Sequence, residues 1–554
     1  MILRRKNLLT ITFLCALAVR AGFALSATGS AFLHFHQVPG LDMQTLLAMS
    51  QWRSGGAFPP VMVPQRILCF LLWLINGGTH RVWQIFLIQS LLGAAGAVLV
   101  ADLTLAVYRR RLAALAVGIF YGSLGTLVLY EFSVLQESIQ LFSVLLGFYA
   151  LISARRKRFS PLYSALAGVF LALGAAGRPV ALPLALAALP WSAVWLRRKK
   201  LPFSRLLPMV SGMAAVWIVL SALNFSFNGT FSPFYNVVSH TAVFHNAGKA
   251  AASAAGYRQV AAAALRQMPR LLLPVEIAEN LNYYFVMWHL PLLRHLPGPG
   301  TLLPLFWLAL AVRILWLKRL GRFGWILLPL LTLLPPLAAR VPIGRYRLLL
   351  LPYMCMALPA LTDWIGRKRL RLAAGLAIAV TAAAFGVSGA VFKIDRFRPG
   401  DCSAWALALE ARDGRTSAES LDWWRKSYAL SATGDTLLAL SLRLYGAGNR
   451  DEAKWLLSGR LTSGDECYVP ACYYLGAFAF EEGDGAAEDY LKRIGDLPGL
   501  SAKQQVRYCF MRAELCRKSG DSRLAADWYR RALEVKGGDE KLKEYISSKC
   551  GRSQ

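Results

Sequence analysis

Residues 82–107, VWQIFLIQSLLGAAGAVLVADLTLAV, decide the class of this chain, and Arg109-Arg110-Arg111 follows almost directly. A helix needs about 20 predominantly apolar residues to cross a bilayer, and this stretch exceeds that length while carrying a single charge, Asp102. Arginine clusters beside apolar stretches mark cytoplasmic helix ends. We therefore expect a transmembrane helix that ends on the cytoplasmic side at these arginines.

The same pattern recurs through residues 1–392. It predicts an all-α chain in which a polytopic membrane domain of about eleven spans precedes a soluble α-helical repeat domain, residues 393–554. The expected spans lie near residues 8–28, 82–107, 112–130, 138–154, 161–177, 179–196, 206–224, 301–317, 323–339, 348–365 and 372–391. Residues 1–28 also fit a signal peptide with the small residues SATGSA at its end, and cleavage there would leave the other spans unchanged.

Charge is distributed as membrane topology would produce it. Residues 1–392 hold 36 of the 62 Lys and Arg but only seven of the 31 Asp and Glu. The excess positive charge lies between apolar segments, which argues against nucleic acid as a partner. Basic clusters lie at residues 4–6, 109–111, 155–158, 197–200, 318–322 and 367–371. They all fall on one side if the short apolar stretch 61–76 lies at the interface without spanning. The N-terminus is then cytoplasmic and residues 393–554 are extracytoplasmic, as in an integral protein of a bacterial inner membrane.

The pattern beyond residue 393 predicts amphipathic helices in repeated pairs. Gly448-Asn449, Gly483-Asp484 and Gly520-Asp521 recur at intervals of about 35 residues, and small and then aromatic residues follow each of them. These segments resemble tetratricopeptide repeats, which implies a protein partner on a concave surface; a generic helical hairpin domain is the alternative. Six of the nine cysteines lie here, and disulfides can form if the domain is extracytoplasmic.

Acidic residues are so scarce in residues 1–392 that they point to a site. Asp102 and Asp363 lie near inner basic clusters and are expected to be their counter-charges. The remaining five fall on the predicted outer side: Asp42, Glu131, Glu137, Glu276 and Glu279. Carboxylates at an apolar membrane face are costly unless they are paired or used, so this clustering predicts one outward-facing site. Solvated loop residues without a shared role are the alternative.

Asp42 is the first catalytic candidate, because it begins the short helical stretch LDMQTLLAMSQWRSGG, although Asp also favours a helix N-terminus for capping. As a general base it would take the proton that an attacking acceptor loses in a transfer reaction, while a phosphate leaving group would need positive charge. Arginine suits phosphate through its forked donors, and headgroup snorkelling is the alternative. Four arginines reach the outer interface against the basic-inside pattern: Arg20, Arg178, Arg345 and Arg347.

In their order along the chain, these segments resemble the GT-C superfamily, which includes protein O-mannosyltransferases and lipid A aminoarabinose transferases. Asp42 to GGAFPP resembles the family's first outer loop, with Met43 where mannosyltransferases often have Glu. YEFSVLQESIQLF carries Glu131 and Glu137 where the family has an acid in its second outer loop. Further segments of the family resemble four stretches of this chain, namely GAAGRPVALP, NGTFSPF with FHNAGKA, VEIAENLNYYF and GRYRLLLLPY. The resemblance implies substrate-binding roles for Arg178, Asn246, Glu276, Arg345 and Arg347.

The resemblance implies a membrane glycosyltransferase that moves a sugar from a polyprenyl-phosphate donor to an acceptor on the outer face, by an inverting mechanism with Asp42 as base. No cofactor is expected, and no metal is implied because the seven histidines show no ligand spacing. A transporter or flippase is one alternative, but transporters place ionisable groups near the bilayer midplane, whereas these acids lie at predicted helix ends. A non-catalytic envelope scaffold is the other, and it predicts no requirement for Asp42.

Overall fold

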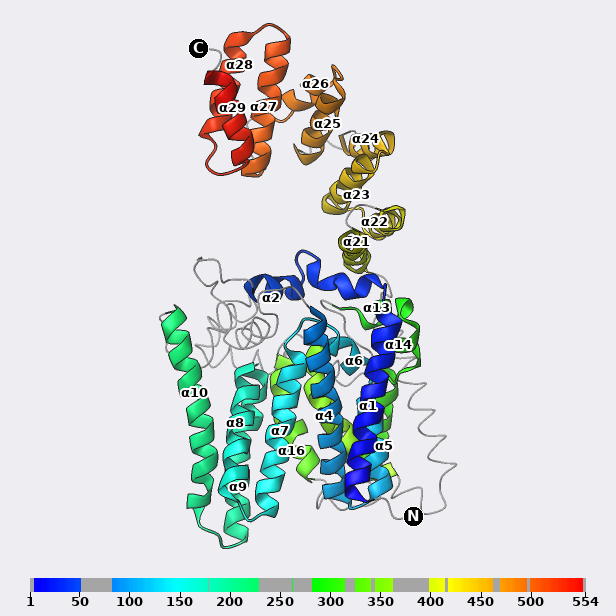
Figure 1. Ribbon diagram of the computed structural model, residues 1–554, viewed down its shortest axis with the longest axis vertical. Helices are drawn as coiled ribbons and strands as arrows, with labels where there is room; N and C mark the ends of the chain where they lie inside the picture. The colour runs from blue at the N-terminus through cyan, green and yellow to red at the C-terminus, as the bar shows by residue number, and fades with distance from the viewer. Residues whose placement is uncertain are drawn as a thin grey trace. The chain divides into compact units, whose positions relative to one another are not determined.

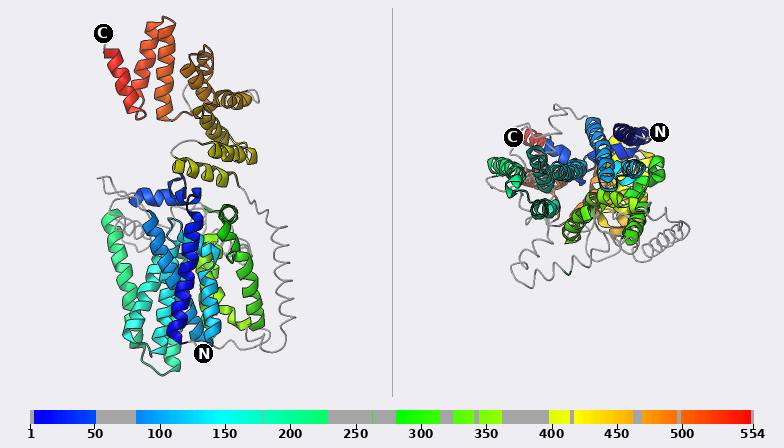
Figure 2. Two further views of the ribbon diagram at one scale, coloured as in Figure 1. Left: turned by 45° about the vertical axis from the view of Figure 1, so that its right-hand side comes forward. Right: turned by 90° about the horizontal axis from the view of Figure 1, so that it is seen from below.

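The protein is known from a computed structural model, shown in Figures 1 and 2. It describes residues 4–50, 82–177, 179–228, 262, 281–313, 324–339, 344–361, 398–413, 417–461, 469–495 and 499–551. Every regular element within these ranges is helical, which confirms the all-α class. The chain divides into two compact units, Met1–Phe397 and Arg398–Gln554, whereas the sequence placed the boundary at residues 392 and 393.

The first unit contains helices that fit a membrane protein. Within the described residues, four helices are long and apolar enough to cross a membrane: α1 (Arg5–Ala27), α4 (Val82–Tyr108), α7 (Glu137–Arg156) and Phe203–Ala222, most of which belongs to α10 (Leu207–Asn228). The helices α5 (Arg111–Gly122) and α6 (Gly125–Glu131) add a fifth if this pair, bent by 50°, is one broken span. Shorter apolar helices cover Pro161–Gly177, Trp325–Leu334 and Leu348–Leu361, and the predicted span 372–391 lies outside the described residues.

The other elements of this unit are shorter. They are η1 (Ala31–Gln37), α2 (Asp42–Ser50), α8 (Pro161–Gly177), η3 (Pro179–Ala181), α9 (Leu182–Arg198), η4 (Phe203–Leu206), α13 (Tyr283–His289), α14 (Pro291–His295), α15 (Pro299–Ala311), α16 (Gly324–Ala339), α17 (Gly344–Arg347), η7 (Leu348–Leu350) and α18 (Leu351–Ala357).

Glycines let the long helices approach each other closely. Figure 1 shows α1, α4, α5, α7 and α8 running side by side, and α8 packs against both α7 and α10. A Cβ on Gly168 of α8 would lie 2.1 Å from the backbone oxygen of Met209 in α10, and one on Gly147 of α7 would lie 2.8 Å from the backbone nitrogen of Leu171. Small residues at such contacts are typical of membrane helices, which associate mainly by close packing.

One end of the first unit holds an ion pair among the basic clusters. Arg5 at the start of α1 donates to both carboxylate oxygens of Asp102 near the end of α4, at 2.8 Å from Nε and 2.5 Å from Nη2. Tyr149 of α7 donates to the same carboxylate at 3.0 Å. The expected role of Asp102 as a counter-charge is thereby confirmed, while Asp363 lies outside the described residues.

The second unit is built from helices that pack in consecutive pairs. Its described elements are α21 (Pro399–Asp413), α22 (Ala418–Leu430), α23 (Gly434–Gly446), α24 (Arg450–Leu461), α25 (Val469–Glu482), α26 (Ala487–Lys492), α27 (Ala502–Lys518), α28 (Ser522–Glu534) and α29 (Glu540–Gly551). The cysteines of this unit in the described part of the chain are free, namely Cys402, Cys472, Cys509, Cys516 and Cys550.

The recurring Gly-Asn and Gly-Asp pairs mark the turns within three of these hairpins. Gly448, Gly483 and Gly520 lie between α23 and α24, α25 and α26, and α27 and α28, with φ angles of 89°, 73° and 87°. Glycine adopts this left-handed conformation at little steric cost. After the last turn, the carboxylate of Asp521 accepts from the backbone N–H of Leu524 and so caps α28. The recurrence of Gly-Asn and Gly-Asp in the sequence is thus explained by the left-handed turn between the two helices of each hairpin.

Candidate functional site

Charged side chains gather at the end of the first unit that lies away from the Arg5–Asp102 pair. Arg20 lies 15 residues after Arg5 in α1, which corresponds to about 22 Å along the helix axis. Figure 1 shows α2 and α6 at this same end of α1. Arg20, Asp42, Glu131, Glu137 and Arg345, five of the residues that the sequence singled out, form ion pairs here.

The first pair, Arg20 with Glu131, is completely buried. Arg20 Nε and Nη2 each lie 2.6 Å from one carboxylate oxygen of Glu131, and the two side chains are 1% and 4% exposed. Arg20 Nη1 donates to the backbone oxygens of Ala16 and Gly122, at 2.8 and 2.7 Å. Gly122 ends α5, where backbone carbonyls lose their helical partners. Arg20 therefore holds the break between α5 and α6 together as well as pairing with a charge.

The second cluster joins Asp42, Arg345 and Glu137. Arg345 Nη1 lies 2.6 Å from Asp42 Oδ2 and 3.8 Å from Glu137 Oε1. The Asp42 side chain, in the first turn of α2, is 48% exposed, whereas Arg345 of α17 is 11% exposed and Glu137, in the first turn of α7, is 2% exposed. One guanidinium thus lies between a buried and a solvent-accessible carboxylate.

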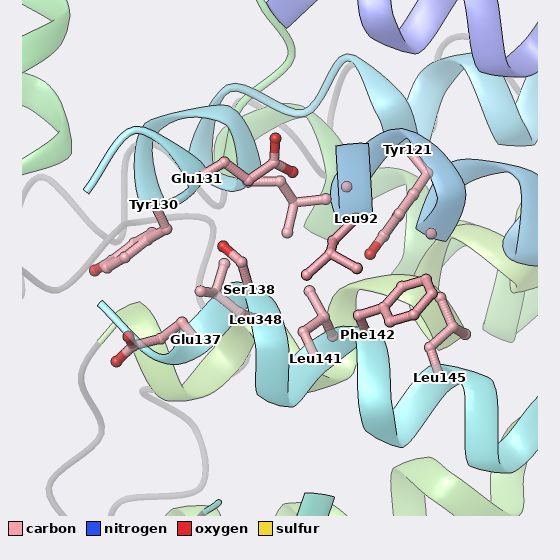
Figure 3. A pocket seen from close by; sticks show the side chains of 13 residues that line it. Leu92, Tyr121, Tyr130, Glu131, Glu137, Ser138, Leu141, Phe142, Leu145 and Leu348 are labelled. Atoms are coloured by element: carbon pink, nitrogen blue, oxygen red, sulfur yellow. The ribbon is translucent and has the colours of Figure 1, made fainter. Parts of the chain in front are cut away.

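A small pocket connects the two clusters, because both Glu131 and Glu137 line it (Figure 3). Its volume is about 20 Å³, which is room for roughly one water molecule. The sequence could not decide which glutamate belongs to a site, and the structure brings both to this pocket. Sequence reasoning missed Tyr121, Tyr130 and Ser138, which also line it, because uncharged residues do not stand out in an apolar chain.

The other predicted site residues are placed elsewhere or lie outside the described residues. Arg347 is buried, but it follows Arg345 by two positions in the short helix α17. Residues two apart on a helix differ by about 200° in direction and do not face the same side. Arg178, Asn246 and Glu276 lie outside the described residues. Within the described ranges, no three His, Cys, Asp or Glu side chains gather closely enough to hold a metal ion.

Gly93 makes room for the buried pair, which gives a first test. A Cβ at this position in α4 would lie 2.0 Å from Glu131 Oε1 and 2.6 Å from Arg20 Nη2. Gly93→Ala is therefore expected to destabilise the protein by about 1–3 kcal/mol, as overpacking does, which thermal unfolding of the solubilised full chain would measure. Gly96→Ala in the same helix is the matched control, because its nearest neighbours lie at 3.7 Å. Equal losses in both variants would contradict the close contact.

The chemistry available at this end is that of carboxylates and guanidinium groups. A carboxylate can act as a general base for a ligand that reaches it, and the Asp42 side chain is 48% exposed. A guanidinium can bind an anion through two parallel donors, and the guanidinium of Arg345 lies beside the Asp42 carboxylate. Comparison with models of known protein families, with curated proteins and with solved structures finds no match to this chain.

Proposed function

We propose that the first unit is a GT-C-type membrane glycosyltransferase that moves one sugar from polyprenyl phosphate to an acceptor at the outer membrane face. The observation that supports this most is the meeting of Asp42, Glu137 and Arg345 at one end of the helices. Asp42 and Arg345 are 303 residues apart in sequence, so the fold and not local structure brings the base candidate to the phosphate-binding candidate.

In the proposed reaction the acceptor hydroxyl attacks the anomeric carbon of the donor sugar with inversion. Asp42 takes the hydroxyl proton, the bond from that carbon to the phosphate oxygen breaks, and the polyprenyl phosphate leaves with the electron pair. Arg345 would bind the phosphate and stabilise its growing charge, so the donor would replace Asp42 as its closest partner. Glu137 would keep this guanidinium oriented from the buried side.

Arg20 and Glu131 fit a positioning role in this proposal better than direct contact with substrate. Each Arg20 nitrogen already has a partner, and both side chains are enclosed. The donor sites implied by the family resemblance then fall to Arg345, Arg178, Asn246, Glu276 and Arg347. The pocket lined by Glu131 and Glu137 has a volume of about 20 Å³, which is too small for a sugar, so in this proposal the donor sugar binds outside it, on the side where Asp42 is exposed.

A role for the second unit follows from its helical hairpins. Their glycine turns support the likeness to tetratricopeptide repeats, and stacked hairpins of that kind bind other chains on a concave face. We assign this unit the recruitment of a protein acceptor or an envelope partner. It would have to lie on the same side of the membrane as Asp42 to do so.

Arg345→Lys tests the proposed donor site. Lysine keeps the charge but loses the forked geometry, so the apparent affinity for polyprenyl-phosphate sugar is expected to fall about tenfold. Arg345→Ala removes the charge as well, and it is expected to lose about 2–5 kcal/mol of donor-binding free energy. Donor titration in a transfer assay measures both. Arg294→Lys is the control, because Arg294 is exposed and, among the described residues, forms no ion pair and donates to the backbone oxygens of Met287 and Trp288. Wild-type affinity in Arg345→Lys would leave this arginine outside the phosphate site.

Reporter fusions test the proposed orientation. An alkaline phosphatase fused after Arg396 is expected to be active in a bacterial host, and a green fluorescent protein at the same point is expected to stay dark, because the one-sided basic clusters place this point outside. A fusion of each reporter after Arg198, within a basic cluster, is the control and should give the reverse. A dark phosphatase with a bright fluorescent protein at Arg396 would mean that residues 61–76 span the membrane or that another span is miscounted.

A further inference from the structure

A second pocket lies among the basic clusters, at the ends of three helices of the first unit. Its volume is about 310 Å³, and it is lined near the C-terminal ends of α4, α7 and α9 and by Trp325 of α16. Four of its nine lining residues are cations, namely Arg109, Arg155, Arg156 and Lys199, and none is acidic. The volume is at the lower end of the range for small-ligand sites.

Arg155 is built into this pocket by aromatic rings. Its guanidinium carbon lies 3.8 Å from the centroid of Trp325 and 5.4 Å from that of Trp195. Trp191 packs edge-on against Trp325, with centroids 3.8 Å apart. Two indole rings thus hold the charge in place while leaving the guanidinium N–H groups free to donate, since cation–π contacts use the ring face and not those hydrogens.

Within the residues that the structure describes, the four cations of the pocket form no ion pair with a carboxylate. Arg5 and Asp102 form an ion pair near this end. Basic residues at helix C-termini and on a cytoplasmic face are common, because both positions favour positive charge. These general causes explain the number of cations, but they do not explain a cavity or a half-buried arginine stacked on tryptophans.

We propose that this pocket binds a phosphate-bearing anion at the level of the lipid headgroups. The phosphate would lie among Arg155, Arg156 and Lys199, with Arg155 donating from its fixed position. Two sources share this chemistry, the headgroup of an anionic phospholipid and a soluble phosphate ester. Basic pockets between transmembrane helices suit the first, because the cytoplasmic leaflet is rich in anionic lipids.

Equilibrium binding of radiolabelled phosphatidylglycerol to the full chain in nonionic detergent tests the proposal. We expect saturable binding that excess phosphatidylcholine does not displace. Glycerol 3-phosphate separates the two sources, because displacement by it shows that the phosphate ester alone suffices, whereas its failure to compete shows that the lipid is required. Phosphatidylcholine that competes as well as phosphatidylglycerol would overturn the proposal.

Paired variants separate this pocket from general attraction to a basic surface. Arg155→Gln is expected to weaken phosphatidylglycerol binding about tenfold or more, as loss of a charged donor does. Arg197→Gln is the matched control, since it removes the same charge from the basic run 197–200, which also holds Lys199, without lining the pocket, and it should change binding less than about twofold. Lys199→Gln, just beyond α9, provides a second test if Arg155→Gln does not fold. Equal losses in the pocket variants and in Arg197→Gln would contradict a specific site.

Discussion

Asp42→Asn is expected to lower the rate of sugar transfer by about a hundred- to ten-thousand-fold, as loss of a general base typically does. Asparagine has nearly the same shape and can still accept a hydrogen bond from Arg345, so the fold should be retained. It cannot take the proton of the acceptor. Because asparagine competes with the phosphate for Arg345 less strongly than a charged carboxylate does, donor affinity should stay the same or rise while kcat falls, which steady-state kinetics would resolve.

Asp451→Asn is a suitable control for this change. Asp451 also lies in the first turn of a helix, α24, and belongs to the second unit, so it tests any general effect of removing an acid from a helix N-terminus. Transfer by this variant should match the wild type. An Asp42→Asn protein that keeps more than half of wild-type turnover would remove Asp42 from the mechanism and shift attention to Glu131 or Glu137.

Arg20→Leu is expected to destabilise the protein by about 3–5 kcal/mol, because it leaves the Glu131 carboxylate buried without its counter-charge. The backbone oxygens of Ala16 and Gly122 would lose a donor at the same time. Chemical unfolding of the solubilised full chain would measure the loss. The variant should also be defective in transfer, since the break between α5 and α6 places Glu131 at the pocket next to Glu137.

The double variant Arg20→Leu, Glu131→Leu distinguishes a lost pair from a lost packing contact. Replacing both partners of a buried ion pair with apolar residues is often close to neutral for stability. We therefore expect the double variant to recover most of what Arg20→Leu loses, so that the two changes are strongly non-additive. A double variant no more stable than Arg20→Leu would show that the charge on Glu131 is not what the arginine compensates.

Much of this site could be predicted from the sequence, because charges are rare in residues 1–392. Scarcity singled out Asp42, Glu131 and Glu137, and the basic-inside pattern singled out Arg20 and Arg345 as exceptions. The pairing could not be predicted, since Arg20 and Glu131 are 111 residues apart and Asp42 and Arg345 are 303 apart. Such contacts depend on how the helices pack.

The bend within the predicted span 112–130 could not be predicted from hydropathy. The structure divides this stretch into α5, which ends at Gly122, and α6, bent by 50° from it, and the pair together is long and apolar enough for one broken span. Arg20 stabilises this bend by donating a hydrogen bond to the backbone oxygen of Gly122, which has lost its helical partner. Hydropathy does not reveal such a contact. The importance of Gly93 was likewise hidden, because small residues are common throughout apolar helices.

The outer arginines that the structure describes lie in different surroundings, and Arg20 and Arg345 belong to separate ion pairs, with Glu131 and with Asp42. Arg347 is buried two positions after Arg345 in α17, and residues two apart on a helix do not face the same side. The donor-binding role implied for Arg347 by the family resemblance therefore remains a proposal that rests on that resemblance alone.

Incubation of the purified full chain with polyprenyl phosphates carrying different radiolabelled sugars, together with envelope extract, tests the central claim most directly. We predict that label from one of these donors moves to an acceptor in the presence of the wild-type protein and stays on the lipid in the presence of Asp42→Asn. A flippase in proteoliposomes would instead move labelled donor across the bilayer without forming product. Label that stays on every donor with the wild-type protein, or moves equally with Asp42→Asn, would contradict the proposed glycosyltransferase.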